Sequence, residues 1–245
     1  MSAEYKNADF VVIGAGIAGA SIAYWLAPHG RTVLLERESQ PGYHSTGRSA
    51  ALYMASYGGE QVRALTLASR AFFLNPPAGF SEHPLLSPRG ALMVAGPGQM
   101  SSLEAHWSVL SAMNTGASKL TAEQTCALVP ALRPEMVEGG LLEPAAMDMD
   151  VHAIHQGYLR GARQHEAQLY CNAEVRGLQR EQNGWLVQTS AGLWRAPVVI
   201  NAAGAWAEQL GQMAGAQSVG LTPCRRSAFT FKPETAFDYA KWPMR

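Results

Sequence analysis

The sequence contains few cysteines and no excess of either charge. Its three cysteines, Cys126, Cys171 and Cys224, are scattered over 245 residues and form no CxxC pair. An odd, scattered set argues against a disulfide framework and favours a reducing compartment. The formal net charge is zero, so the composition gives no indication of a nucleic-acid partner. We therefore expect free thiols and no binding to nucleic acid.

The sequence also lacks a long apolar run and a secretion signal. None of its apolar stretches approaches the ~20 residues that a membrane-spanning helix needs. The opening residues MSAEYKNADF lack the basic and apolar regions of a signal peptide. Together with the cysteine usage, these absences predict a cytoplasmic protein, and they leave peripheral attachment to the inner membrane open.

A metal centre is the next kind of site that the sequence disfavours. Potential ligands gather in Asp148, Asp150, His152 and His155. Asp150, however, is placed to cap a helix over residues 151–165, and the two histidines have the spacing of neighbours on that helix. A histidine pair without a fuller ligand set is weak evidence for a metal. We predict no metal site.

The most specific pattern in the chain lies in residues 9–36. An apolar run at 10–13 leads into the hexapeptide GAGIAG at 14–19, a helical segment, and an apolar run at 32–35 that ends at Glu36. In such a GxGxxG turn the first glycine allows the tight turn, the second admits a pyrophosphate, and the third lets helix and strand pack closely. The helix N-terminus attracts phosphate, and Glu36 can accept hydrogen bonds from ribose hydroxyls. The stretch predicts a site for the ADP half of NAD or FAD.

The section from residue 60 to 150 breaks the alternation of strands and helices that is typical of a Rossmann domain. Apolar spacing predicts a helix over residues 61–74, with Leu65 on its apolar face. The remaining elements expected there are a strand at 92–95 and helices at 100–113 and 121–128. Thr121 and Gln124 have the spacing of a capping box at the start of the last helix. We interpret this section as an inserted second domain.

Alternating elements return after this section. The dipeptide Asn183-Gly184 predicts a hairpin turn between two strands. Residues 198–200 are apolar and predict a buried strand, which leads into a turn at 201–206 and then a helix. A strand is expected again at 225–231.

Four segments occur in an order that is typical of a known family. They are the GAGIAG turn, the loop HSTGRSA at 44–50, the turn NAAGAW at 201–206 and the segment PCRR at 223–226. Together they resemble the superfamily of FAD-dependent D-amino acid oxidases and dehydrogenases. Within it, the chain is most similar to the bacterial D-arginine dehydrogenase type of D-amino acid dehydrogenase. The resemblance covers the whole chain but stops short of the C-terminal part of a family member.

The resemblance implies an α/β fold in which a Rossmann-like FAD-binding domain of the GR2 type is interleaved with an α+β substrate domain. Residues 1–60 and 150–216 would form the FAD-binding domain. Residues 61–149 and 217–245 would belong to the substrate domain, which would be incomplete at its C-terminus. FAD is thereby preferred over NAD. The missing part implies a fragment or a companion C-terminal segment, so we expect these residues alone to be inactive.

The resemblance also assigns roles to individual residues. Tyr57 and Arg226 are expected in the catalytic site, where the guanidinium of Arg226 would clamp the substrate carboxylate with two parallel hydrogen bonds. A strand at 225–231 would turn Arg225 to the opposite face from Arg226. The expected FAD-binding residues are Gly14, Ala15, Gly16, Ile17, Ala18, Gly19, Glu36, Arg37, His44, Ser45, Thr46, Gly47, Arg48, Ser49, Ala50, Ala51, Val175, Ala203, Gly204 and Trp206.

The implied reaction is the oxidative deamination of a D-amino acid. A hydride would pass from the α-carbon to the flavin N5 atom, and the imine would then hydrolyse to a keto acid and ammonia. The electrons are expected to continue to a respiratory carrier and not to oxygen. Two alternatives remain open at this point: a glycine- or sarcosine-type amine oxidase, and a non-catalytic FAD-binding fragment or subunit.

Two positions depart from the D-arginine dehydrogenase pattern. Leu52 stands where those enzymes carry a histidine, and Ala91 stands where they carry the acid that meets the substrate guanidinium. A guanidinium is costly to bury when no acid compensates its charge. We therefore expect a substrate with a neutral or apolar side chain in place of arginine.

Overall fold

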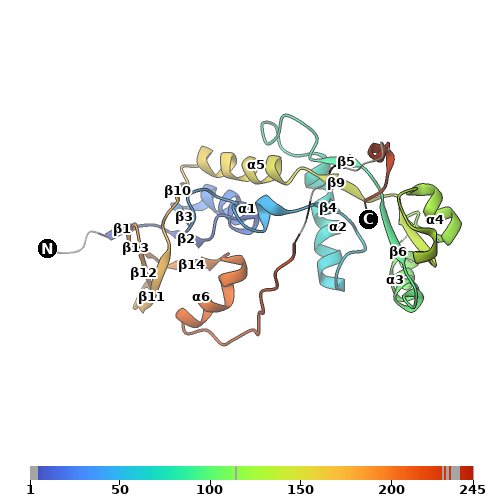
Figure 1. Cartoon of the computed structure of the whole chain (residues 1–245). Coiled ribbons are helices and arrows are strands. Elements are labelled where there is room, and N and C mark those ends of the chain that lie inside the picture. The colour runs from blue at the N-terminus through green and yellow to red at the C-terminus, as the bar shows by residue number, and fades with distance from the viewer. Residues whose placement is uncertain (1–4, 114, 228, 230–231, 233–237, 245) are drawn as a thin grey trace. The chain divides into compact units, whose positions relative to one another are not determined.

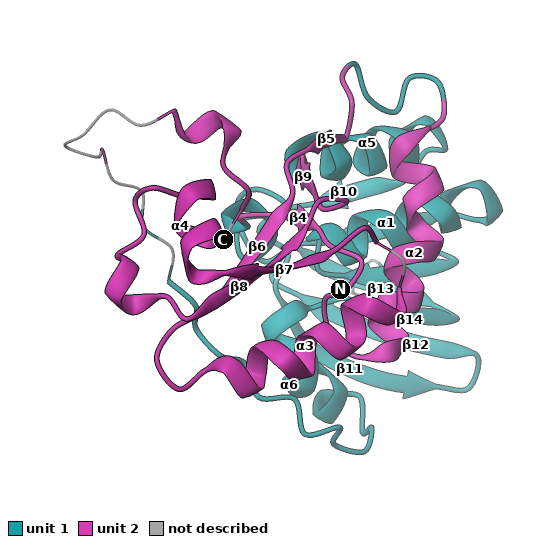
Figure 2. Ribbon diagram, turned by 90° about the vertical axis from the view of Figure 1, so that its right-hand side faces the viewer, with its two compact units in different colours: residues 1–49, 78–82, 151–229 teal, residues 50–77, 83–150, 230–245 magenta. Residues whose placement is uncertain are grey.

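The computed structural model describes residues 5–113, 115–227, 229, 232 and 238–244. The chain divides into two compact units, which Figure 2 shows in different colours. Unit 1 is made of Met1–Ser49, Ala78–Glu82 and Val151–Phe229, and unit 2 of Ala50–Pro77, His83–Asp150 and Thr230–Arg245. Both units combine helices and strands, in agreement with the predicted α/β class. The assignment of residues to an FAD-binding and a substrate domain stays a prediction.

A four-stranded parallel sheet forms the centre of unit 1. Its strands lie in the order β10-β3-β2-β14, and their bounds are Gln168–Tyr170, Thr32–Leu35, Phe10–Ile13 and Val198–Asn201. The strands β2 and β3 have the bounds that the sequence predicts. Val11 and Val12 point to opposite faces of the sheet, yet both are fully buried. Both faces are therefore covered, as is usual for a parallel sheet.

Two helices pack together beside this sheet. Helix α1 (Ile17–Leu26) follows β2 and continues into the short helix η1 (Ala27–His29), and α5 (Val151–Gln164) lies alongside α1 (Figure 1). Glycine permits the close approach, because a Cβ at Gly161 would lie 2.3 Å from the ring of Tyr24. Tyr24, Phe80 and Tyr158 then form an edge-to-face aromatic cluster that holds the two helices together.

A second four-stranded sheet of unit 1 has the order β1-β13-β12-β11, with bounds Tyr5–Asn7, Gly192–Ala196, Gly184–Thr189 and Val175–Glu181. The predicted hairpin joins β11 and β12, but its loop is Gln182 and Asn183, because Gly184 already pairs with Glu181. A Cβ at Gly184 would lie 2.4 Å from the carbonyl oxygen of Ala196. Gly184 is thus required as the first residue of β12 and not as a residue of the two-residue loop.

The predicted strand at 198–200 is present as β14 but is not buried. Val198 is 44% exposed, because β14 is the edge strand of the parallel sheet and pairs only with β2 among the described residues. The chain continues into η4 (Gly204–Trp206) and α6 (Ala207–Met213). Residues 221–227 form no strand, contrary to the prediction for 225–231, since no described strand lies beside them to accept their hydrogen bonds. Residues 228, 230 and 231 of that predicted strand lie outside the described residues.

Unit 2 contains two three-stranded antiparallel sheets. The first has the order β4-β9-β5, with bounds Leu52–Tyr53, Met147–Met149 and Leu86–Pro88, and the second has the order β6-β8-β7, with bounds Ala91–Ala95, Gly139–Glu143 and Ser118–Thr121. Its helices are α2 (Glu60–Leu74), α3 (Met100–Ala112) and α4 (Ala122–Leu128), with the short helices η3 (Pro134–Met136) and η5 (Tyr239–Lys241). The predicted capping box at the start of α4 is present: Gln124 N donates to Thr121 Oγ1 over 3.1 Å, and Thr121 N donates to Gln124 Oε1 over 2.9 Å.

Helix α2 begins and ends within one residue of its predicted bounds, but its apolar face is not part of a core. None of its residues is buried, and Leu65 is 69% exposed. Phe73 is partly buried, because it packs against the cluster of Tyr53, Leu86 and Met147. None of the helices within the described ranges combines the length and the hydrophobicity that crossing a membrane requires.

Candidate functional site

The GAGIAG turn joins β2 to α1 in unit 1 with very little free space. Gly14 has a φ of +100°, and its N–H donates to the Leu35 carbonyl oxygen over 2.8 Å. A Cβ at Gly14 would lie 2.4 Å from the carbonyl oxygen of Ala202, and a Cβ at Gly19 would lie 1.8 Å from that of Gly14. The first and third glycines of the motif are therefore sterically required for the turn and for the packing of the helix on the strand.

Glu36 lies beside this turn at the carboxyl end of β3. Its Oε2 accepts the N–H of Ala15 over 2.9 Å, and its Oε1 accepts the N–H of Glu38 over 3.0 Å. The side chain is only 7% exposed. A carboxylate offers about four acceptor positions, so two further donors, such as ribose hydroxyls, can still be accommodated.

The loop after β3 folds back onto the start of α1. Its short helix η2 (Thr46–Arg48) places Thr46 Oγ1 3.0 Å from the N–H of Ile17. Gly47 N donates to the Gly42 carbonyl oxygen over 2.7 Å, and a Cβ at Gly47 would come within 2.5 Å of that oxygen. The predicted FAD-binding residues of this loop thus lie next to those of the turn.

The turn at 201–206 brings further predicted residues to the same region. Ala202 N donates to the Ile13 carbonyl oxygen over 2.9 Å, which carries the chain past the GAGIAG turn. The Trp206 ring lies 4.8 Å from the Arg37 guanidinium and 4.8 Å from the His44 ring, measured to the ring centroid. Glu38 completes the group, because its Oε1 is 2.9 Å from His44 Nε2.

The donors left over at the turn suit the pyrophosphate of a dinucleotide. The N–H groups of Gly14, Ala15 and Ile17 are bonded within unit 1, whereas the N–H of Gly16 has no acceptor among the described residues. A Cβ at Gly16 would meet only Thr46 Oγ1, at 3.3 Å, so the backbone there is open. An unpaired N–H at a helix N-terminus is the usual arrangement for binding phosphate.

The remaining predicted site residues belong to other segments of the chain. Val175 opens β11, next to Glu174, whose carboxylate is 3.2 Å from the Arg37 guanidinium. Arg226 lies in exposed coil of unit 1. Tyr57 belongs to unit 2, as do Ala50 and Ala51, and is 59% exposed. The roles of these residues stay predictions.

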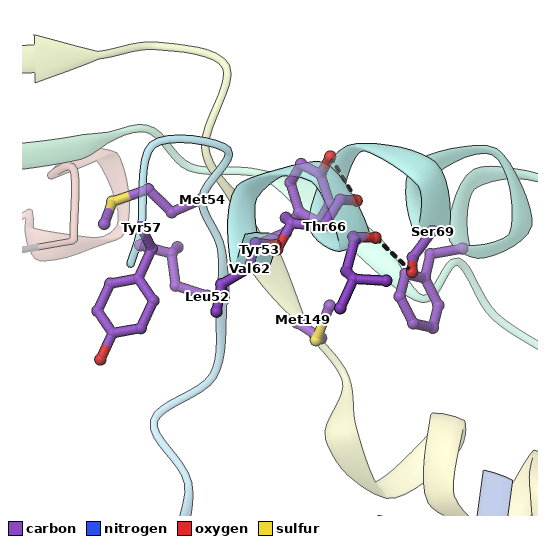
Figure 3. Close-up of a pocket in the computed structure, with 10 residues that line it drawn as sticks. Leu52, Tyr53, Met54, Tyr57, Val62, Thr66, Ser69 and Met149 are labelled. Carbon is purple, nitrogen blue, oxygen red and sulfur yellow. Dashed lines mark hydrogen bonds between the residues drawn. The ribbon is translucent and has the colours of Figure 1, made fainter. Parts of the chain in front are cut away.

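A pocket of about 300 Å³ lies beside Tyr57 in unit 2 (Figure 3). No charged side chain is among its lining residues, which are Leu52, Tyr53, Met54, Tyr57, Val62, Leu65, Thr66, Ser69, Phe73 and Met149. The hydroxyls of Thr66 and Ser69 donate within α2, and Tyr53 Oη donates to the Thr66 carbonyl oxygen over 3.2 Å. The Tyr57 hydroxyl is thus the one polar side-chain group of the lining that has no hydrogen-bond partner among the described residues.

The two positions that depart from the D-arginine dehydrogenase pattern each lie opposite an acidic residue in their sheet. Leu52 lines the pocket, and Ala91 is 3% exposed within β6. The carboxylate opposite Leu52 in the sheet is that of Asp148, and it is paired with Arg89 over 2.8 Å. Ala91 lies opposite Glu143, a fully buried carboxylate with no ion-pair partner among the described residues. The acid beside Leu52 is therefore compensated, whereas the acid beside Ala91 is not.

Two buried polar residues have surroundings that sequence reasoning missed. His155 is 3% exposed, and its Nε2 lies 2.9 Å from the Ala15 carbonyl oxygen. Glu143 in unit 2 is fully buried and accepts the Ser56 hydroxyl over 2.5 Å. Its Oε1 has no hydrogen-bond partner among the described residues. No local motif marks either residue, because their partners are 140 and 87 positions away.

No group of three His, Cys, Asp or Glu side chains is placed to hold a metal ion within the described part of the chain. The absence of a metal site stays a prediction.

Comparison with known proteins gives relatives of several activities. Dimethylglycine dehydrogenase from mouse mitochondria is 28% identical over 221 residues, which are 86% of this chain and 25% of the relative. L-2-hydroxyglutarate dehydrogenase from Escherichia coli K12 is 26% identical over 239 residues, which are 92% of this chain and 54% of the relative. The chain thus spans about a quarter to just over half the length of these relatives. A specific likeness to D-arginine dehydrogenases stays a prediction.

Solved structures show the same fold. Glycine oxidase from Geobacillus kaustophilus superposes with a TM-score of 0.74 at 23% identity, covering 85% of this chain and 58% of that one. L-α-glycerophosphate oxidase from Mycoplasma pneumoniae, with FAD bound, gives a TM-score of 0.75 at 20% identity, covering 87% and 58%. These structures confirm the FAD-binding oxidoreductase fold predicted from the sequence, and together with the family match they confirm the FAD cofactor. The family described as DAO, FAD dependent oxidoreductase, matches residues 9–245, and this chain belongs to it.

Proposed function

We propose that the protein oxidises the amine of a D-amino acid whose side chain is neutral or apolar. The observation that carries this proposal is the pocket of about 300 Å³ beside Tyr57, which is lined without any charged side chain. A volume of this order lies at the lower end of small-molecule sites. It is suited to an apolar side chain and offers no carboxylate to a guanidinium.

FAD, when bound, supplies the acceptor for the hydride that leaves the substrate α-carbon. The residues of the chain would bind and orient the substrate. Arg226 would hold the carboxylate through two parallel hydrogen bonds, and Tyr57 would lie next to the reacting amine. Leu52 would contact the side chain and exclude water from it. The imine released would hydrolyse in water to a keto acid and ammonia.

A second candidate is an oxidoreductase for glycine or an N-methylated glycine. The relatives named dimethylglycine dehydrogenase, sarcosine dehydrogenase and glycine oxidase favour it. Glycine and sarcosine have no side chain to fill an apolar pocket, and this favours the first candidate. A third candidate is an FAD-binding part without catalysis of its own.

Anaerobic reduction of the FAD-loaded protein separates the three candidates. The substrates are D-leucine, D-methionine, D-arginine, glycine and sarcosine, and loss of flavin absorbance is followed with time. Fastest reduction by D-leucine or D-methionine supports the proposal. Fastest reduction by glycine or sarcosine supports the second candidate. No reduction by any substrate supports the third, in line with the expectation that these residues alone are inactive.

A variant at the pocket tests the specificity directly. Leu52→Glu would place a carboxylate at the pocket, and kcat/KM for D-arginine relative to D-leucine is expected to rise about tenfold, the equivalent of ~1.4 kcal/mol. Leu52→Met is the matched control, since it changes shape without adding charge. A wild-type protein that prefers D-arginine would refute the proposed specificity.

The electron acceptor is proposed to be a respiratory carrier. Reduction of a quinone analogue by the substrate-reduced protein, without peroxide in air-saturated buffer, would support this. Stoichiometric peroxide with oxygen consumption would identify an oxidase instead.

A further inference from the structure

Both backbone polar groups of Ala15, the second residue of the GAGIAG turn, are bonded to the protein. Its N–H donates to Glu36 Oε2 over 2.9 Å. Its carbonyl oxygen accepts the N–H of Gly42 over 3.1 Å and lies 2.9 Å from His155 Nε2. Glu36 and Gly42, which lie close together in sequence, and His155 from α5 thus converge on one residue of the turn, and they fix the orientation of the peptide groups on both sides of it.

His155 is held tightly in this arrangement. It projects from α5 and is 3% exposed. Gly42, with a φ of +73°, lies directly against the imidazole, because a Cβ at Gly42 would be 3.1 Å from the ring Cε1. The ring therefore has a defined position between α5, the loop after β3 and the turn.

The bond to Ala15 has a geometric consequence for Gly16. The Ala15 carbonyl and the Gly16 N–H belong to the same peptide group, and in a planar trans peptide these two groups point in opposite directions. His155 and Gly42 draw the carbonyl toward the interior of unit 1. The Gly16 N–H, which has no acceptor among the described residues, is consequently turned away from His155.

We propose that His155 is a positioning residue of the FAD site, which holds the Ala15 carbonyl through Nε2–H and thereby aims the Gly16 N–H at the pyrophosphate. The inference depends on FAD binding, which the family membership shows, and not on the identity of the substrate. His155 itself does not touch the cofactor in this scheme. Its effect passes through one peptide group.

The surroundings of His155 favour the neutral ring over the charged one. Burial lowers the pKa of His155, and His152 on the same helix lowers it further, while the bond to Ala15 and the carboxylate of Glu36 act in the opposite direction. Gln156 Nε2 lies 3.5 Å from Nδ1. A neutral ring with its hydrogen on Nε2 donates to Ala15 and leaves Nδ1 as an acceptor.

The first test uses the unmodified chain. Nitrogen-15 NMR of the imidazole distinguishes the two neutral tautomers, and the proposal requires the hydrogen of His155 on Nε2 at neutral pH. A hydrogen on Nδ1 alone would overturn the proposal, because Nε2 could then not donate to Ala15.

The second test compares substitutions by their affinity for FAD, measured through flavin fluorescence. His155→Leu retains an apolar body but loses the donor, and its Kd for FAD is expected to rise about tenfold. His155→Gln retains an N–H donor on a side chain of similar reach and is expected to stay within about twofold of the wild type. His152→Leu, on the exposed side of the same helix, is the matched control and is expected to leave the Kd unchanged.

The amides of Ala15 and Gly42 provide a readout that does not need FAD. Their hydrogen exchange is expected to be about tenfold faster in His155→Leu than in His155→Gln, since the loss of one donor loosens the shared peptide group. If His155→Leu does not fold, His155→Asn takes its place in both measurements. Its side chain is too short for the amide donor to reach the Ala15 carbonyl oxygen. Equal Kd values and equal exchange rates for the donor and non-donor variants would overturn the proposal.

Discussion

Substitution of single glycines in the GAGIAG turn should separate folding from cofactor binding. In Gly19→Ala the new Cβ would lie 1.8 Å from the Gly14 carbonyl oxygen and 3.0 Å from the Gly14 carbonyl carbon. Helix α1 and strand β2 would have to move apart by about 1.2 Å before the first contact reaches 3.0 Å, and the neighbouring atoms are backbone that cannot change rotamer. In Gly16→Ala the only contact is with Thr46 Oγ1 at 3.3 Å, and a small side-chain movement relieves it.

The expected magnitudes differ accordingly. Overpacking of this kind costs ~3 kcal/mol, so Gly19→Ala should lower the Tm by about 6–12 °C for a chain of this length. Gly16→Ala should change the free energy of unfolding by less than ~1 kcal/mol. Its methyl group would stand where the pyrophosphate approaches the backbone, so its Kd for FAD should rise at least about tenfold.

The assays are thermal and urea denaturation of the chain without FAD, and titration with FAD by fluorescence. Gly211→Ala is the control, because Gly211 lies in α6 with no atom within 4 Å of its new Cβ. Alanine there should be neutral or stabilise by up to ~1 kcal/mol. Wild-type stability in Gly19→Ala, or an equal loss of stability in Gly16→Ala and Gly19→Ala, would refute the steric reasoning.

Three further predictions concern residues outside the turn. Glu143→Ala should lower the free energy of unfolding by ~3 kcal/mol, because it leaves a cavity and an unpaired Ser56 hydroxyl. Glu143→Gln keeps an acceptor for Ser56 and should lower the free energy of unfolding by less than ~1 kcal/mol. Urea denaturation measures both values, and equal losses would contradict this reasoning. Burial lowers the pKa of His155 from its ordinary 6.5, so unfolding takes up a proton below that pH, and the free energy of unfolding should fall as the pH falls from 6.5 toward the lowered pKa. His155→Gln should flatten this dependence, and an unchanged pH profile would exclude His155 as its source. Thr121→Ala should cost ~1 kcal/mol and Thr121→Ser far less, since Ser keeps the acceptor for Gln124 N; a thermal melt that does not distinguish them would rule out the cap as stabilising.

Elements whose determinants are close together in sequence could be predicted in detail. Strands β2 and β3 have the predicted bounds, because short runs rich in apolar and β-branched residues that end at a glycine or an acid define them locally. The capping box of α4 needs only residues three positions apart. These patterns depend on backbone geometry within a few residues, so they do not need the rest of the fold.

Other predictions went wrong because their determinants are not local. Residues 198–200 have the composition of a central strand, but β14 lies at the edge of its sheet among the described residues. A strand at 225–231 requires a neighbour to pair with, and residues 225–227 have none that the structure describes. Apolar spacing on α2 indicated a buried face, yet Leu65 is exposed, since spacing reveals a face and not what covers it.

The amino-acid order alone identified a dinucleotide fingerprint, and the resemblance of four segments to one family selected FAD. That was feasible because a GxGxxG turn with its strand, helix and acid is compact in sequence. Tertiary structure was needed to bring His155 to the Ala15 carbonyl and Glu143 to Ser56, and to form the apolar pocket beside Tyr57. The two hydrogen bonds join residues that are 140 and 87 positions apart. No local sequence pattern predicts such a pair, because only the folded backbone brings the two residues together.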